Sequence, residues 1–113
     1  MTTLTHLQAE AALCLWEAMM EMRDEPEAPE GMDQRWTDIG TVDMRHIAID
    51  LAPFVCEVYD AMPKEAKECV PYDWEVVPAI LRTVRFTSDQ ERFIRPTVHE
   101  AAARAAELLT AQN

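Results

Sequence analysis

One histidine lies between two carboxylates at helical spacing and is the first candidate for chemistry. Asp43, His46 and Asp50 follow the spacing i, i+3, i+7, so a helix would carry all three on one face. Such a group could ligate a divalent metal, or the carboxylates could tune the imidazole as a general base. A catalytic metal site typically needs three well-placed ligands and a supporting shell, and no other residue nearby supplies them. We therefore interpret this group as an ordinary exposed helix face and expect no metal or cofactor.

The other reactive side chains lack the sequence context of an active site. His99 and Glu100 lie at the expected start of the last helix, where capping explains Glu100. Cys14, Cys56 and Cys69 are widely spaced and form no C-x-x-C pair, which excludes a zinc knuckle and favours buried, reduced thiols. Nucleophile-elbow, P-loop and dinucleotide-binding motifs are absent from the sequence. We expect a protein that is not an enzyme.

The acidic residues are concentrated in the N-terminal half of the chain. The 113 residues include 21 acidic and 10 basic side chains, for a net charge of −11. Residues 1–60 carry 13 acids against Arg23, Arg35 and Arg45, a net charge of −10, whereas residues 61–113 carry eight acids and seven bases, a net charge of −1. Such a field repels nucleic acid and anionic lipid and attracts basic surfaces. The charge therefore disfavours direct nucleic-acid binding and favours a basic protein partner.

A stripe of carboxylates on the first expected helix continues into MRDEPEAPEGMD, residues 22–33. On an ideal helix the carboxylates of this stripe are separated by about 10, 6 and 4.5 Å along the axis, on the order of the phosphate spacing of a DNA strand. The predicted partner-binding site is this stripe with the acids that follow it and one aromatic: Glu10, Glu17, Glu21, Asp24, Glu25, Glu27, Glu30, Asp33 and Trp36. The alternative is a solubilising surface, and net charge alone does not separate the two.

A basic island lies in the C-terminal half. Arg82 with Arg85, and Arg92 with Arg95, form two pairs at i, i+3 spacing. The island could bind phosphate, but four arginines in a chain of net charge −11 make a poor DNA-reading surface. Pairing with the acidic half, or a contact with another copy of the chain, is the more economical interpretation.

The first helix must position most of the acidic stripe. Thr5 and Gln8 form a capping-box pattern that predicts where this helix begins. Leu13, Trp16 and Met20 widen its apolar surface beyond half of the circumference, so the helix is either central in the fold or buries a second face against another chain. A homodimer is therefore an open expectation. The inward-facing line is expected to be Leu7, Ala11, Leu15, Ala18 and Met22.

Helical patterns continue after a proline-containing acidic connector, residues 24–35. A helical period runs from Thr41 to Met62 with Pro53 inside it, which predicts either a kink near Asp50 or two consecutive helices. The line that keeps this period is Ile47, Leu51, Val55, Val58 and Met62.

Shorter helical patterns follow to the end of the chain. We predict a short helix within 63–69, another from Asp73 to about Arg85, and an alanine-rich last helix over 98–112. Further start signals are the pairs Ser88–Glu91 and Thr97–Glu100. Strand signals are limited to 74–77 and 83–87. The sequence thus predicts an all-α fold, a compact bundle of about five helices with proline-kinked segments.

The three tryptophans fit core packing better than a binding groove. They occur at helical spacing with leucines and isoleucines, among seven methionines. Tyr72 and Trp74 flank Asp73 at an expected helix entry, where a partly exposed aromatic pair could anchor a partner.

In size, acidity and absence of catalytic motifs, with MRDEPEAPEGMD as its most prominent feature, the chain resembles small phage-encoded inhibitors such as anti-CRISPR proteins. The resemblance implies an inhibitor that occupies the basic, nucleic-acid-binding surface of a partner, such as a CRISPR surveillance complex, through acidic residues and an aromatic. The alternative is a helical adaptor or accessory subunit that binds through apolar helix faces. No membrane span or signal peptide is evident in the sequence, so we expect a single cytoplasmic domain over residues 1–113.

Overall fold

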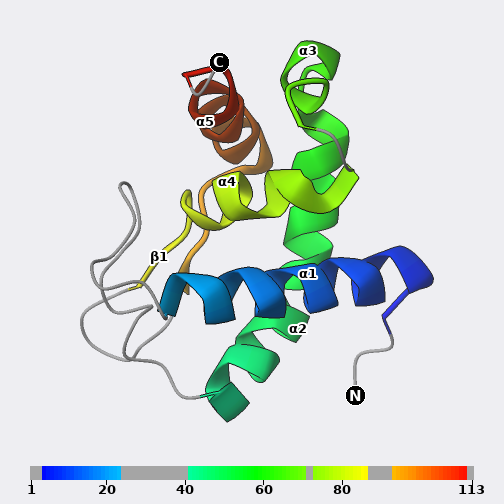
Figure 1. Ribbon diagram of the computed structural model, residues 1–113, viewed down its shortest axis with the longest axis vertical. Helices are drawn as coiled ribbons and strands as arrows, with labels where there is room; N and C mark the ends of the chain where they lie inside the picture. The colour runs from blue at the N-terminus through cyan, green and yellow to red at the C-terminus, as the bar shows by residue number, and fades with distance from the viewer. Residues whose placement is uncertain (1–3, 24–40, 71–72, 87–92, 112–113) are drawn as a thin grey trace.

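Helices make up nearly all of the regular structure in the computed structural model, which describes residues 4–23, 41–70, 73–86 and 93–111 (Figure 1). In chain order the elements are α1 (His6–Arg23), α2 (Thr41–Ala61), α3 (Lys64–Lys67), the 3₁₀ helix η2 (Asp73–Val76), α4 (Val77–Leu81), β1 (Arg85–Phe86), β2 (Phe93–Ile94) and α5 (Val98–Ala111). The strands form one short antiparallel pair, with Arg85 opposite Ile94 and Phe86 opposite Phe93. The all-α prediction is confirmed.

Side-chain caps mark the starts of the two terminal helices. At the start of α1, Thr5 N–H donates to Gln8 Oε1 and Gln8 N–H donates to Thr5 Oγ1, each over 3.1 Å. At the start of α5, Glu100 N–H donates to Thr97 Oγ1 over 3.1 Å. These bonds satisfy amide groups that have no partner within the first helical turn. Both starts were predicted from the sequence; the Ser88–Glu91 signal lies outside the described residues.

Helix α2 continues through Pro53 as a single element. Proline has no N–H to donate to the carbonyl four residues earlier, so its place inside a helix costs stability. Burial around it compensates, because Leu51, Ala52, Phe54 and Val55 are all buried. The alternative of two consecutive helices is therefore wrong.

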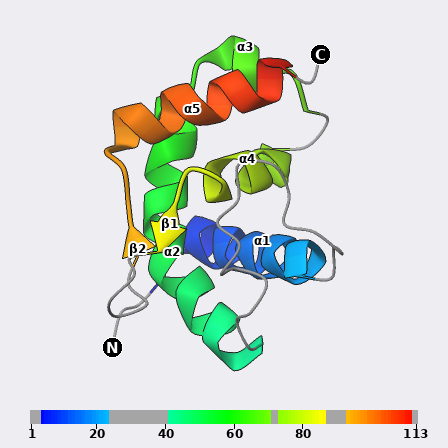
Figure 2. The ribbon, with the colours of Figure 1, turned by 90° about the vertical axis from the view of Figure 1, so that its left-hand side faces the viewer.

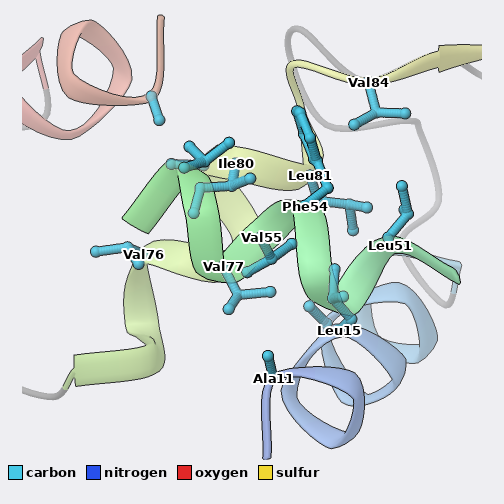
Figure 3. Close-up of a cluster of buried hydrophobic side chains, with 14 of the residues drawn as sticks. Ala11, Leu15, Leu51, Phe54, Val55, Val76, Val77, Ile80, Leu81 and Val84 are labelled. Carbon is cyan, nitrogen blue, oxygen red and sulfur yellow. The ribbon is translucent and has the colours of Figure 1, made fainter. Parts of the chain in front are cut away.

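Helices α1, α4 and α5 are stacked one beside another along the length of α2 (Figure 2). The buried side chains between them form one apolar cluster, in which Leu15 of α1 meets Leu51 and Val55 of α2 while Ile80 and Leu81 of α4 lie above (Figure 3). Every residue of this cluster is apolar, and no charged side chain is buried among the described residues. The helix carboxylates whose side chains the structure describes therefore all lie at the surface.

Two expectations about local structure were wrong. Leu7 is 60% exposed, because the buried residues of α1 begin at Ala11 and the N-terminal end of the helix extends past α2 (Figure 1). The helix expected to reach about Arg85 ends at Leu81 with Arg82 as its C-cap. The predicted helix start at Asp73 is confirmed by η2, so of the two weak strand signals 74–77 is helical, and part of 83–87 forms strand β1.

Candidate functional site

A groove follows each side of the exposed crest of α1. We use "crest" for the line of α1 opposite to its buried face, which is marked by Leu13. Leu13 lies two residues from both Ala11 and Leu15, so it points away from the core and is 56% exposed. One groove lies between α1 and the η2–α4 segment, and the other lies between α1 and α2.

The first groove, here called the acidic groove, has a volume of about 500 Å³. Helix α1 contributes Glu17 and Glu21, which are one helical turn apart and so point to the same side. The opposite wall contributes Glu75 and Trp74 from η2. Three exposed carboxylates and one aromatic side chain thus line the same groove. The groove is completed by Cys14, Ala18 and Pro78.

The carboxylates of the acidic groove have no cationic partner among the described residues. The ion pairs among the described residues all join side chains three or four positions apart: His6–Glu10, Lys64–Glu68 and Arg104–Glu107. Glu17, Glu21 and Glu75 take part in none of them. The groove therefore presents negative charge to an incoming cation without first having to break an internal pair.

Trp74 is held in place by aromatic packing. Its ring centre lies 5.2 Å from that of Tyr59 on α2, with the ring planes inclined at 41°. The Tyr59 ring is also contacted by Lys67, whose Nζ atom lies 4.6 Å from the ring centre. Trp74 remains half-buried, so part of its ring lines the acidic groove. A fixed aromatic face beside carboxylates is a suitable seat for a guanidinium group.

The cysteines are free thiols and only half-buried, which corrects the expectation that they are core residues. Burial, and then the charges of Glu17 and Glu10, raise the pKa of the Cys14 thiol. Burial also raises the pKa of Cys56, with Asp60 and Glu57 adding to the effect. A raised pKa leaves less thiolate at neutral pH, so neither sulfur is activated as a nucleophile.

The second groove, here called the apolar groove, has a volume of about 290 Å³. Its lining residues are Ala12, Leu13 and Trp16 of α1 with Arg45, Ala48 and Ile49 of α2. The single charged group is Arg45, whose Cζ lies 5.5 Å from the centre of the Trp16 ring. Ile49 is 38% exposed, so both helices leave aliphatic surface open to solvent here.

The structure brings together part of the predicted partner-binding site. Glu10, Glu17 and Glu21 are exposed on α1. Glu17 and Glu21 line the acidic groove, whereas Glu10 Oε1 lies 3.2 Å from His6 Nε2. Six predicted members lie outside the described residues: Asp24, Glu25, Glu27, Glu30, Asp33 and Trp36.

Sequence reasoning missed one carboxylate of the groove, Glu75. Trp74 had been considered as a partner anchor, although together with Tyr72, which lies outside the described residues. The signal that could have found Glu75 is its position beside Trp74 at the start of a helix, but only tertiary packing places it opposite α1.

The structure gives no support to the metal interpretation of Asp43, His46 and Asp50. His46 and Asp50 are exposed on α2, and the side chain of Asp43 lies outside the described residues. No group of three potential metal ligands occurs in the described part of the chain. None of the helices in that part is long and apolar enough to cross a membrane.

The basic island is held by its own backbone and by an aromatic ring. Arg85 Nη1 donates to the Arg82 carbonyl over 3.0 Å, and Arg95 Cζ lies 5.9 Å from the centre of the Phe54 ring. Arg92 lies outside the described residues. The suggested pairing of this island with the acidic half of the chain stays a prediction, because many of the acids in that half lie outside the described residues.

Comparison with known proteins identifies no relative of this chain. No protein-family model, curated protein or solved structure matches the chain.

Proposed function

We propose that this chain is a protein-binding inhibitor that uses the acidic groove to occupy a basic, nucleic-acid-binding surface of its partner. The observation that supports the proposal is that Glu17, Glu21 and Glu75 line one groove with Trp74 and have no cationic partner among the described residues. The anti-CRISPR-like type suggested by the sequence gives the class of target, a nucleoprotein complex whose basic channel normally holds DNA or RNA.

The mechanism is competition between two polyanions for one basic surface. Carboxylates from both walls of the acidic groove would neutralise an arginine or lysine that otherwise contacts a phosphate, and Trp74 would pack on an arginine side chain. The net charge of −11 would speed the encounter, since long-range attraction raises association rates. The apolar part of the groove would lengthen the lifetime of the complex.

A charge-reversal experiment tests the proposal. The probe is an arginine-rich peptide bound to a fluorescent DNA duplex, and the measurement is release of the duplex on adding the protein. The wild-type chain should release the DNA, and the triple variant Glu17→Lys, Glu21→Lys, Glu75→Lys should need about tenfold more protein or worse, because three exposed attractions become repulsions.

The matched control reverses three exposed carboxylates that line neither groove: Glu57→Lys, Asp60→Lys and Glu65→Lys. This control has the same net charge as the test variant, so it separates a local site from overall acidity. Equal loss in both variants would contradict a site at the acidic groove. Capture by the wild-type and test variants, with mass spectrometry of what is retained, then identifies the natural target.

A helical adaptor that binds through apolar faces is the second candidate function. The observation that favours it is the apolar groove, where Leu13 and Ile49 remain exposed beside Trp16. The two functions respond differently to salt. Binding through the acidic groove should weaken steeply as ionic strength rises, whereas binding through the apolar groove should change little.

A further inference from the structure

We infer that the apolar groove is the contact surface for a second copy of this chain, which inserts its own Leu13 between Trp16 and Ile49. This inference concerns the groove of α1 that the proposed function does not use, and the two share only the carboxylate of Glu17. It rests on the shape and exposure of the groove and on the match between its one charge and the charges beside Leu13.

The groove is a concave surface and the crest of the same helix supplies a projecting side chain. Ala12 and Ala48 on its floor are small and buried, while Leu13 and Ile49 on its rims are 56% and 38% exposed. A leucine inserted there would meet alanine methyl groups below and aliphatic or aromatic surface on both sides. In a symmetric dimer each copy supplies both the groove and the leucine.

The charges support a second copy over a basic partner. The only charged residue that lines the groove is Arg45, held beside Trp16 at 5.5 Å, and it would repel a basic surface. The inserted leucine has Glu10 and Glu17 on either side of it along the helix, about 4.5 and 6 Å away in axial rise. One of these carboxylates therefore comes near Arg45 whichever way the second helix runs across the groove.

The net charge of the chain determines how this dimer should respond to salt. Two chains of −11 repel each other, and salt screens that repulsion. Dimerisation should therefore strengthen with added salt up to moderate ionic strength, the opposite of the trend expected for binding at the acidic groove. The two proposals can fail separately for this reason.

Sedimentation velocity of the full chain over a range of protein concentrations, at low and moderate salt, tests the inference. The wild-type chain should show a concentration-dependent dimer. Leu13→Glu should weaken the dimer by about ten- to a hundredfold, because a charged group replaces the leucine that the dimer contact would bury. Far-UV circular dichroism should remain unchanged, since Leu13 is not part of the core.

A charge-exchange variant distinguishes a specific contact from general stickiness. Arg45→Glu should weaken the dimer, and adding Glu10→Arg with Glu17→Arg should restore it. A wild-type chain that stays monomeric throughout would overturn the inference, as would a dimer unaffected by Leu13→Glu. If the chain stays monomeric and Leu13→Glu instead weakens DNA release from the arginine-rich peptide, the groove belongs to the partner and the inference is equally wrong.

Discussion

The two sides of α1 differ in the charge of their exposed residues and in the contacts that these residues make. On the side facing α2, the one charged residue in the groove, Arg45, contacts the Trp16 ring, and the remaining lining is apolar. On the side facing η2 and α4, Glu17, Glu21 and Glu75 lie together without a counter-ion among the described residues. Helix α1 thus separates an apolar groove from a groove whose carboxylates repel one another.

The difference shows that the acidic side of α1 carries a cost in stability that the apolar side does not. Like charges one helical turn apart destabilise a helix, and pairing one of them with a lysine would remove that cost. The acidic groove retains Glu17 and Glu21 at this spacing, with Glu75 on its other wall, whereas Glu68 and Glu107 have local partners in Lys64 and Arg104. A surface that keeps an avoidable repulsion is a better candidate for binding than one that has relieved it.

The largest effect is expected from truncating the buried leucine by which α1 packs against the core. Leu15 is fully buried, and Leu15→Ala should lower the free energy of unfolding by about 2–5 kcal/mol through lost burial and a cavity. Leu13→Ala, two residues away on the crest, should lower it by less than about 1 kcal/mol. Urea denaturation of both variants measures the difference. Equal losses would mean that the crest is packed and that α1 does not have one buried and one open side.

This contrast between Leu13 and Leu15 follows from the helical period, and so do several other features of the fold. The capping pairs Thr5–Gln8 and Thr97–Glu100 predicted where α1 and α5 begin, because a cap is decided by residues three apart. Local pattern did not predict that α2 continues through Pro53, since that depends on the packing of its neighbours.

The candidate site was predictable only in part for the same reason. Periodicity placed Glu17 and Glu21 on one side of α1, but Glu75 is more than fifty residues away and reaches them only through the fold. The contact of Arg45 with Trp16 likewise joins two helices. Sequence reasoning identified the faces of single helices, and packing decided which faces meet.

A smaller effect is expected on the apolar side. Arg45→Ala removes the cation–π contact with Trp16 and should lower the free energy of unfolding by about 0.5–1 kcal/mol. His46→Ala is the matched control, because His46 is exposed on the same helix and does not line the groove. Thermal and urea denaturation compare them. A loss no greater for Arg45→Ala than for the control would show that Arg45 is held only loosely on this side.

An effect of opposite sign is expected on the acidic side. Glu17→Gln removes the repulsion from Glu21 and should raise the free energy of unfolding by about 0.2–0.5 kcal/mol. Glu107→Gln in α5 removes the pair with Arg104, whose Nη1 lies 3.0 Å from the carboxylate, and should lower it by about the same amount. Low-salt denaturation gives the best resolution, because salt screens both terms. Destabilisation by Glu17→Gln would mean that Glu17 has a stabilising partner.

The smallest effect is on the reactivity of Cys14, which lines the acidic groove and reports its potential. Burial raises the pKa of this thiol, and the charges of Glu17 and Glu10 raise it further, so its rate of alkylation at neutral pH should be below that of a free peptide cysteine. In a chain carrying Cys56→Ser and Cys69→Ser, the rate should follow a titration whose midpoint lies above the ordinary value of 9.0.

Glu17→Gln should lower the pKa of Cys14 and so increase its alkylation rate at neutral pH, because one of the charges that raise this pKa is removed. The rate should stay below that of the free thiol, because burial is the larger cause and the variant leaves it in place. Glu57→Gln is the control, since that charge acts on Cys56 and lies outside the acidic groove. If both variants change the Cys14 rate equally, the potential is spread over the whole surface. If only Glu17→Gln does so, the negative potential is local to the groove that we assign to partner binding.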